Sequence, residues 1–288
     1  EYLGWLLHYQ AEISSGNGRI SLFEIIEVLE NFLENEGHDK SLASEFFTAI
    51  RERVCAIVSR VQNTFEFEVQ PLREYFSAKY LYHTAPYSPV GAEKKGTLAE
   101  RFEALASNFY WTNVVRFYAG CFNKGELPML ILKLEELQEK EYLKYTNHAR
   151  TLASLTLSDW VFTQYPKLLG RVIEIIIDGI GSRAILNQNA KGGNEPLSLP
   201  KKCGREELFS ECFEQLKKFP PKDYAIELIA LIKANQDDNL LKEAWLTNFS
   251  KLRGKSYKTL WFEYGLHLEL IHQLTFDELR VIFDGEDQ

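Results

Sequence analysis

Hydrophobic and polar positions in the first forty residues follow a helical spacing on both sides of a glycine-rich stretch. Residues 2–10 are mostly apolar and aromatic and predict the end of a helix that begins upstream, whereas SSGNG at 14–18 predicts a loop. Ser21 and Glu24 stand at the spacing of a helix capping box, and Gly37 is placed to end that helix. The predicted apolar face of this helix consists of Leu22, Ile25, Ile26, Leu29, Phe32 and Leu33.

The following segment changes from a helical to an alternating pattern. A second helix is predicted over about 41–54, with an apolar stripe made of Phe46, Phe47, Ile50 and Val54. Residues 55–69 then predict a β-hairpin with a turn at 60–64, because Phe65, Phe67 and Val69 alternate with polar residues. Pro71 fits the first turn of a closing helix, where its missing N–H has no intrahelical partner. The predicted apolar face of that helix consists of Leu72, Tyr75, Phe76 and Tyr80.

These elements predict a mainly α fold. A winged-helix-like unit with a short β-hairpin is followed, from Leu98 onward, by helical periodicity without a fixed repeat, which is typical of an irregular α-helical array of the HEAT or armadillo kind. The expected organisation is the end of an upstream helical segment at 1–18, a winged-helix-like subdomain at 19–82, a linker at 83–97, a first part of the array at 98–186, a polar loop at 187–202 and a second part of the array at 203–288.

Composition narrows the possible partners and compartment. A chain of 288 residues that is 45% hydrophobic and 26% charged has the composition of a water-soluble globular protein. The net charge of -8 argues against broad nucleic-acid binding, which needs a positive surface. Four cysteines without a CxxC pair predict reduced thiols in a cytoplasmic protein, and the longest apolar run, at 171–181, is too short to span a membrane. Because the chain starts at Glu1 inside an apolar segment, we expect it to be part of a longer polypeptide.

The stretch FEFEVQPLREYFSAKYLY at 65–82 resembles the end of the winged-helix subdomain in NACHT-type NTPases of the STAND class. Phe67 falls on the phenylalanine of the family's aromatic-rich strand, and ISLFEIIEVLENFLE at 20–34 is similar to the family's first winged-helix segment. The positions that match the pattern of the family's closing helix are Leu72, Arg73, Glu74, Tyr75, Phe76, Ala78, Tyr80 and Leu81. We interpret these matched residues as structural.

This resemblance implies a function for the chain. It is expected to be the C-terminal part of a NACHT/STAND signalling NTPase, a non-catalytic portion that relays nucleotide state to a helical sensor region in bacterial defence, including antiphage defence, or in signalling. The implied partners are the upstream NTPase domain of the same polypeptide and a protein trigger, with no membrane or nucleic acid.

Two departures from the family bear on nucleotide chemistry. Val69 stands where the family often has a histidine that can approach the nucleotide phosphates, and valine can neither carry charge nor donate a hydrogen bond. The chain also has no G-x-x-x-x-G-K-[ST] motif, and SSGNG and AKGGN lack the lysine of a P-loop. We therefore expect no enzyme activity, catalytic residue or bound cofactor in this chain, and ATP or ADP with Mg²⁺ only in the upstream domain.

Several local patterns have alternative interpretations. The aromatic segment 101–122 predicts either a core between the winged helix and the array or a groove for a partner. Glu66 and Glu68 share a strand face but are interpreted as solvated, and His267 and His272 have poor spacing for a metal site. A dispersed hydrolase site has no supporting local motif.

Nucleic-acid recognition is the main alternative function. The helix at 41–54 occupies the position of a DNA-reading helix, but its arginines are balanced by glutamates. Basic residues cluster at 201–205 and 251–258, and the second cluster includes Tyr257 and precedes Trp261. The alternative is therefore a helical scaffold with a winged-helix head that binds DNA or protein.

Overall fold

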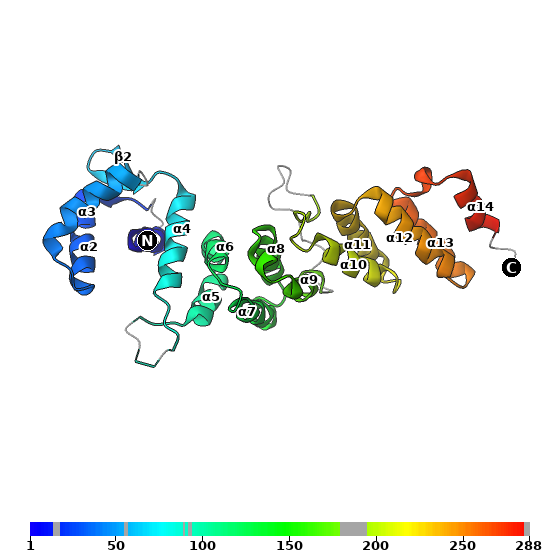
Figure 1. Cartoon of the computed structure of the whole chain (residues 1–288), viewed down its shortest axis with the longest axis horizontal. Helices are drawn as coiled ribbons and strands as arrows, with labels where there is room; N and C mark the ends of the chain where they lie inside the picture. Colours follow the sequence, from blue (N-terminus) through cyan, green and yellow to red (C-terminus); the bar gives the residue numbers. More distant parts are fainter. Residues whose placement is uncertain (14–17, 55–56, 89, 92–93, 179–194, 285–288) are drawn as a thin grey trace. The chain divides into compact units, whose positions relative to one another are not determined.

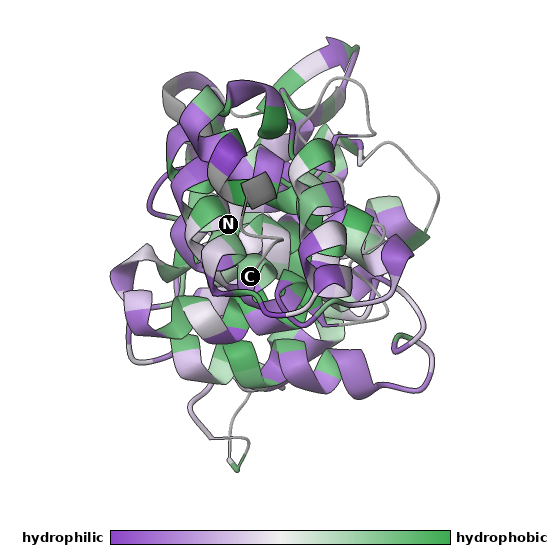
Figure 2. Cartoon of the chain, turned by 90° about the vertical axis from the view of Figure 1, so that its right-hand side faces the viewer, coloured by the Kyte–Doolittle hydropathy of each residue, from purple (hydrophilic) through white to green (hydrophobic). Residues whose placement is uncertain are grey.

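The structure is a computed structural model that describes residues 1–13, 18–54, 57–88, 90–91, 94–178 and 195–284. Its contacts divide the chain into two compact units, Glu1–Phe122 and Asn123–Gln288. The described residues are mainly helical, as predicted, and their helices carry hydrophobic and hydrophilic positions side by side (Figure 2).

The first unit begins with a winged helix. Three helices and three strands follow in the order helix, strand, helix, helix, strand, strand, and the antiparallel sheet has the strand order β1-β3-β2. Its elements are α1 (Tyr2–Ile13), β1 (Ile20–Ser21), α2 (Leu22–Asn35), α3 (Ala43–Ala49), β2 (Ile57–Val61) and β3 (Thr64–Phe67). Helix α1 packs on α4, and its Leu3 and Leu7 belong to the hydrophobic core of this unit.

Local sequence signals account for much of this unit. The Ser21 backbone N–H donates to the Glu24 carboxylate at 2.9 Å, and the Glu24 N–H donates to Ser21 Oγ at 3.2 Å, which confirms the predicted capping box. Gly37 has a φ of +78°, in the left-handed region that favours glycine, just after α2. Asn63, with a φ of 60°, lies in the turn between β2 and β3 and confirms the predicted hairpin turn.

The predicted helix at 41–54 is less regular than its pattern indicates. It starts as a 3₁₀ turn, η1 (Lys40–Leu42), continues as α3 and ends in a π-helical segment at Ile50–Val54. Phe47 is buried and contacts Phe65 edge-on at 5.0 Å, but Phe46 is 51% exposed, so the predicted stripe is wrong at Phe46. Adjacent residues on a helix point about 100° apart, and the core admits only one of the two rings.

The closing helix, α4 (Gln70–His83), has its proline in the first turn, as predicted. Its predicted apolar face is wrong, since Tyr75 is 40% exposed and Leu72, Phe76 and Tyr80 are only partly buried. The residues that α4 buries are Arg73, Glu74, Ser77 and Ala78. Of these, Glu74 accepts hydrogen bonds from Gln70 of α4 itself and from Asn113 of α6, whereas the buried Ser77 hydroxyl has no hydrogen-bond partner among the described residues.

Two more helices complete the first unit. They are α5 (Leu98–Ala106) and α6 (Thr112–Gly120), separated by the 3₁₀ turn η3 (Phe109–Trp111). Helix α6 packs on α4, and α1 lies between α2 and α4 (Figure 1). The contacts therefore divide the chain at Phe122 and not within the predicted linker, and α5 and α6 belong to the unit of the winged helix. The aromatic residues of 101–122 that lie in its core are Phe102, Trp111, Tyr118 and Phe122.

The second unit is an array of helices in which neighbours in the chain pack on one another, as the sequence predicts (Figure 1). Its helices are α7 (Leu127–Glu139), α8 (His148–Ser158), α9 (Leu169–Ile177), α10 (Arg205–Leu216), α11 (Lys222–Asn235), α12 (Asp238–Lys251), α13 (Lys255–His267) and α14 (Phe276–Asp284). Helix α7 packs on α8, α8 on α9, α9 on α10 and α10 on α11. Helices α12 and α13 are joined by Trp245 and Trp261, whose indole N–H groups each donate to the other residue's carbonyl oxygen, at 3.0 and 3.2 Å.

Part of the predicted polar loop at 187–202 is packed. Residues 179–194 lie outside the described ranges, but Leu197 and Leu199 are buried. The side chain of Asn235 on α11 accepts a hydrogen bond from Leu199 N at 2.8 Å and donates one to Leu197 O at 2.6 Å. These bonds fix the backbone of the segment before α10 and satisfy a fully buried amide.

Candidate functional site

The sequence-predicted site residues gather on β3 and α4. Phe67 lies on β3, and Val69 is the exposed N-cap residue of α4, where its side chain makes no capping hydrogen bond. The residues on α4 are Leu72, Arg73, Glu74, Tyr75, Phe76, Tyr80 and Leu81. They are divided between two sides of the helix: Arg73 and Glu74 are buried, whereas Phe76 and Tyr80 line a cavity together with Phe67. Helix α4 is therefore the element on which the candidate site is built.

Helix α4 lies unusually close to α1 because Gly4 has no side chain. A Cβ atom at Gly4 would lie 2.6 Å from Cβ of Phe76 and 3.0 Å from the backbone nitrogen of Ser77. Real Cβ atoms do not approach that closely, so any larger residue at this position would force the two helices apart. The close approach sets the backbone of α4 at Arg73 and Ser77 directly against α1.

A polar network fills the junction between α1, α4 and α6. The Glu74 carboxylate accepts hydrogen bonds from Gln70 at 2.7 Å and from Asn113 of α6 at 3.4 Å. The Glu12 carboxylate of α1 accepts from Asn108 Nδ2 at 2.5 Å and from Trp111 Nε1 at 2.8 Å. These bonds tie α1 and α4 to the η3–α6 region, so that the three helices meet through specific hydrogen bonds as well as by packing.

His8 is the most deeply buried ionisable side chain of this junction. Its ring is 1% exposed, stands edge-on to Trp111 at 4.5 Å and lies 4.8 Å from the Tyr110 ring, and among the described residues neither ring nitrogen has a hydrogen-bond partner. Burial, together with a smaller contribution from the nearby Arg73 charge, lowers the pKa of His8 from 6.5 to about 4, and Glu12 opposes the shift. At neutral pH His8 is therefore uncharged.

The junction should weaken as the pH falls. In the unfolded chain His8 takes up a proton near pH 6.5, but in the folded protein only near pH 4, so folding opposes protonation between these values. One such proton changes the free energy of unfolding by about 1.4 kcal/mol per pH unit. The free energy of unfolding of the native protein should therefore decrease as the pH is lowered from 6.5 to 4.5.

Urea unfolding at several pH values checks this expectation, with His8→Phe as the comparison. Phenylalanine keeps a ring against Trp111 but cannot be protonated. Between pH 6.5 and 4.5 the free energy of unfolding of the variant should therefore fall less than that of the native protein, and the difference is the contribution of the one proton that His8 binds. Because the variant retains Glu12, Arg73, Glu74 and Tyr110, the difference isolates His8. An unchanged slope would show that His8 does not resist protonation.

Arg101 of α5 fastens the end of α4 to the segment that follows it. Its guanidinium donates to Leu81 O at 2.6 Å, to Thr84 Oγ1 at 2.8 Å and to Lys95 O at 2.9 Å. On the same end of α4, the Tyr82 ring lies against the rings of two core residues, Tyr118 and Phe122. The predicted linker at 83–97 is thus held at both of its ends in the described residues.

The other sequence-predicted groups are used in local structure. Glu66 forms ion pairs with Arg19 at 2.7 Å and Arg60 at 3.1 Å, which explains its place on the strand face without acid–base chemistry. Within 201–205, Cys203 is buried and Arg205 donates to Leu199 O at 2.6 Å. Trp261 is buried in the second unit, whereas Tyr257 is exposed and rests on the Phe219 ring at 4.8 Å.

The cysteines and the pair His267 and His272 are the remaining candidates for reactive or metal-binding groups. Cys121, Cys203 and Cys212 are not in disulfides, and Cys55 lies outside the described residues. Burial raises the pKa of Cys212 to about 12, which keeps it a thiol. His267 and His272 belong to no group of three or more potential metal ligands in the part of the chain that the structure describes.

The surface at the DNA-reading position of the winged helix shows no excess of positive charge among its described residues. Helix α3 exposes Glu45 and Phe46, and the Arg51 guanidinium of the following segment is paired with the neighbouring Glu52 carboxylate at 2.8 Å. A DNA-reading helix presents positive and hydrogen-bonding side chains to the phosphates and bases. The described side chains at this position do not present that arrangement.

Sequence reasoning missed the part of the site that α1 supplies. His8 and Glu12 are one turn apart on an otherwise apolar and aromatic helix, so they share one of its faces. That spacing was the available signal. Their partners Asn108 and Trp111, about a hundred residues later, have no corresponding signal in the sequence.

Comparisons of the chain with protein-family models, with curated proteins and with solved structures give no significant match. Among the described helices, none is both long and apolar enough to pass through a membrane. The geometry described above therefore carries the functional argument, together with the resemblance of residues 65–82.

Proposed function

We propose that this chain is the non-catalytic regulatory portion of a NACHT/STAND signalling NTPase. Its winged helix relays the nucleotide state of an upstream domain to a helical region that senses a trigger. The setting that the resemblance implies is bacterial defence or signalling in the cytoplasm. The partners in this proposal are the upstream NTPase domain and a protein trigger.

The observation that supports this proposal best is the double attachment of α4. This helix carries the matched motif, and its buried residues pack on α1 on one side while Glu74 and Tyr75 reach α6 on the other. A displacement of the winged helix must therefore carry α5 and α6 with it, since breaking the polar junction would leave buried polar groups without partners. A relay needs such a rigid connection between an input and an output element.

The sequence also supports a role in which this chain does not itself bind or hydrolyse a nucleotide. The chain contains no P-loop motif, and Val69 at the start of α4 can neither donate a hydrogen bond to a phosphate nor carry a charge. On this proposal, ATP or ADP with Mg²⁺ binds upstream. Residues of α4 would then follow the nucleotide state through the position of the winged helix.

The first test is the thermal stability of residues 1–288 with and without millimolar ATP or ADP and Mg²⁺. We expect no shift in Tm. A ligand present at 100 times its Kd would stabilise the fold by about 2.7 kcal/mol, which is several degrees for a domain of this size. A reproducible increase in Tm of that size with ATP or ADP, and not with Mg²⁺ alone, would contradict the proposal that the nucleotide binds upstream and not to residues 1–288.

A nucleic-acid-binding scaffold is the second candidate, and basic residues around the connection from α12 to α13 favour it. Lys251, Arg253 and Lys255 are exposed there, and Lys258 is part-buried. Against it stand the net charge of -8 and the exposed Glu45 of α3. We expect no binding of duplex DNA or RNA at about 150 mM salt in a fluorescence anisotropy titration.

The contrary result would be sub-micromolar binding that weakens steeply with salt. Six to ten phosphate contacts would lower affinity by about 10³–10⁵-fold between 50 and 200 mM salt. If such binding were lost in the triple variant Lys251→Glu, Arg253→Glu, Lys255→Glu, the second candidate would replace the first.

A further inference from the structure

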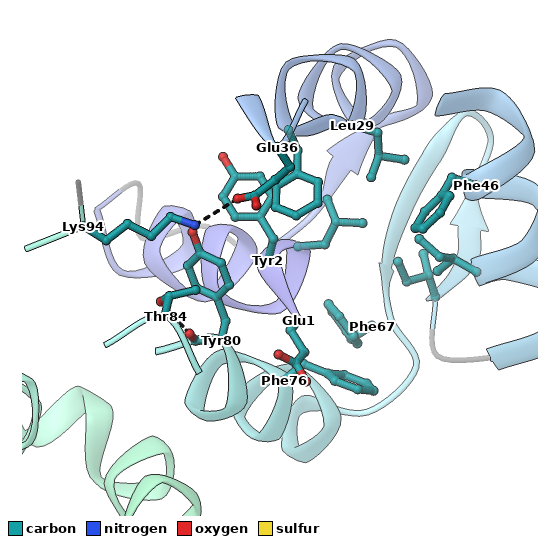
Figure 3. Close-up of a pocket in the computed structure, with 14 residues that line it drawn as sticks. Glu1, Tyr2, Leu29, Glu36, Phe46, Phe67, Phe76, Tyr80, Thr84 and Lys94 are labelled. Atoms are coloured by element: carbon teal, nitrogen blue, oxygen red, sulfur yellow. Dashed lines mark hydrogen bonds and ion pairs between the residues drawn. The ribbon is translucent and has the colours of Figure 1, made fainter. Parts of the chain in front are cut away.

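A cavity of about 390 Å³ lies inside the winged helix, on the side of α4 opposite the polar junction. Residues of α1, α2, α3, the π-helical segment after α3, β2, β3 and α4 line it, and Figure 3 shows lining side chains pointing into it. Its inner wall is apolar and consists of Leu3, Leu29, Ile50, Ile57, Phe67 and Phe76. A cavity of this volume with an apolar wall can hold the body of a small organic molecule.

Aromatic rings form one side of the cavity. Tyr2 stacks on Phe32 with ring centroids 5.0 Å apart, and the Tyr80 ring lies 5.4 Å from that of Tyr2. All three residues line the cavity and are drawn in Figure 3. The faces of such rings are negatively polarised and attract cations.

The chain itself places an ammonium group at this position. Nζ of Lys94 lies 5.7 Å from the centroid of the Tyr80 ring and 3.0 Å from a carboxylate oxygen of Glu36, as the dashed line in Figure 3 shows. Lys94 therefore demonstrates that a cation fits between an aromatic ring and a carboxylate at the edge of an apolar cavity. Both of its partners belong to the body of the winged helix, whereas Lys94 comes from the segment that connects α4 to α5.

We propose that this cavity is a binding site for a small molecule with an apolar body and a cationic head, such as an aryl- or alkylammonium compound. The body occupies the space between Phe67, Phe76 and Leu29, and the head replaces the Lys94 ammonium beside Tyr80 and Glu36. Lys94 acts as a built-in competitor that the ligand displaces. The proposal is independent of the nucleotide relay, because it rests only on the cavity and the Lys94 contacts.

The competitor is easily displaced. The side chains of Lys94 and Glu36 are each about two-fifths exposed, and exposed ion pairs are held weakly. An ammonium on a ligand whose body fills the cavity gains the same two contacts and buries apolar surface in addition. Once the Lys94 ammonium is displaced, an anionic head would lie beside the Glu36 carboxylate, so the site should discriminate by charge.

Three probes of the same shape test this discrimination by calorimetric titration into the 288-residue chain: 4-phenylbutylamine, 4-phenylbutanol and 4-phenylbutyrate. We expect the amine to bind about tenfold more tightly than the alcohol, and the carboxylate to bind most weakly of the three. A tenfold ratio corresponds to about 1.4 kcal/mol, within the range of a cation–π contact combined with an ion pair.

Three single-residue variants locate the binding. Lys94→Ala removes the competitor and should strengthen amine binding several-fold, whereas Lys95→Ala makes the same charge change at the next, exposed residue and should leave it unchanged. Glu36→Gln should abolish the preference for the amine over the alcohol. Equal affinities for all three probes, or no amine binding to the Lys94→Ala variant at millimolar concentration, would overturn the proposal.

Discussion

Replacing Gly4 with leucine is expected to lower the free energy of unfolding of the first unit by about 3 kcal/mol. A side chain at this position meets Cβ of Phe76 and the backbone of α4, neither of which can move aside without shifting the helix. The helices must separate, and the buried polar groups of the junction, including those of His8 and Glu74, then lose their packing. The effect combines overpacking with the exposure of a polar network.

The control for this change is Gly120→Leu in α6 of the same unit. Nothing lies within 4 Å of a Cβ at Gly120, and leucine is a better helix former than glycine, so this variant should be as stable as the native protein or more stable. Urea unfolding followed by far-UV circular dichroism measures both. If the two glycines gave the same change, α1 and α4 would not be in close contact.

Replacing Trp245 with alanine is expected to cost the second unit about 3–5 kcal/mol. The indole is fully buried, and its loss leaves a cavity between α12 and α13. It also removes one of the two reciprocal hydrogen bonds and leaves the Trp261 carbonyl, which accepted it, without that donor. Few single side chains in this unit combine so much buried area with a backbone hydrogen bond.

A matched tryptophan in the same unit provides the comparison. Trp160 is half-exposed, so Trp160→Ala should change the free energy of unfolding by about 1 kcal/mol or less. Differential scanning calorimetry on both variants separates buried from exposed tryptophan. Similar losses for the two would contradict the packing of α12 on α13.

The features that the sequence predicts well are local. The capping box of α2, the turn at Asn63 and the proline at the start of α4 each depend on residues within one or two turns of each other. Their physical causes are complete within the segment, so the pattern alone is sufficient. The same holds for the helical array, whose apolar spacing needs only neighbouring helices to pack against.

The features that the sequence does not predict depend on distant partners. Tyr75 and Phe76 look like the core side of α4, but Arg73, Glu74 and Ser77 are the buried residues, because α1 offers a glycine at the contact and α6 offers a hydrogen bond to Glu74. A hydrophobicity pattern treats buried polar residues as exposed unless their partners are known. The resemblance to the family identified α4 as important but did not indicate which side of it is buried.

The sequence likewise predicts only part of the candidate site. The motif positions on α4 were named from the sequence, whereas His8 and Glu12 became visible only when α1 was placed against α4. The cavity beside Tyr80 was also missed, since Tyr2, Phe32, Tyr80 and Lys94 come from four separate segments. Such a site exists only after the chain has folded.

Hydrogen exchange on the polypeptide extended upstream of Glu1, measured by mass spectrometry with ADP and with a non-hydrolysable ATP analogue, tests the central claim most directly. If α4 relays nucleotide state, amides of α4 (Gln70–His83) and of α6 (Thr112–Gly120) should change protection together between the two nucleotides. Residues 1–288 alone should show no nucleotide-dependent difference. Failure of the extended polypeptide to bind either nucleotide, or binding that leaves the protection of α4 and α6 unchanged, would contradict the account.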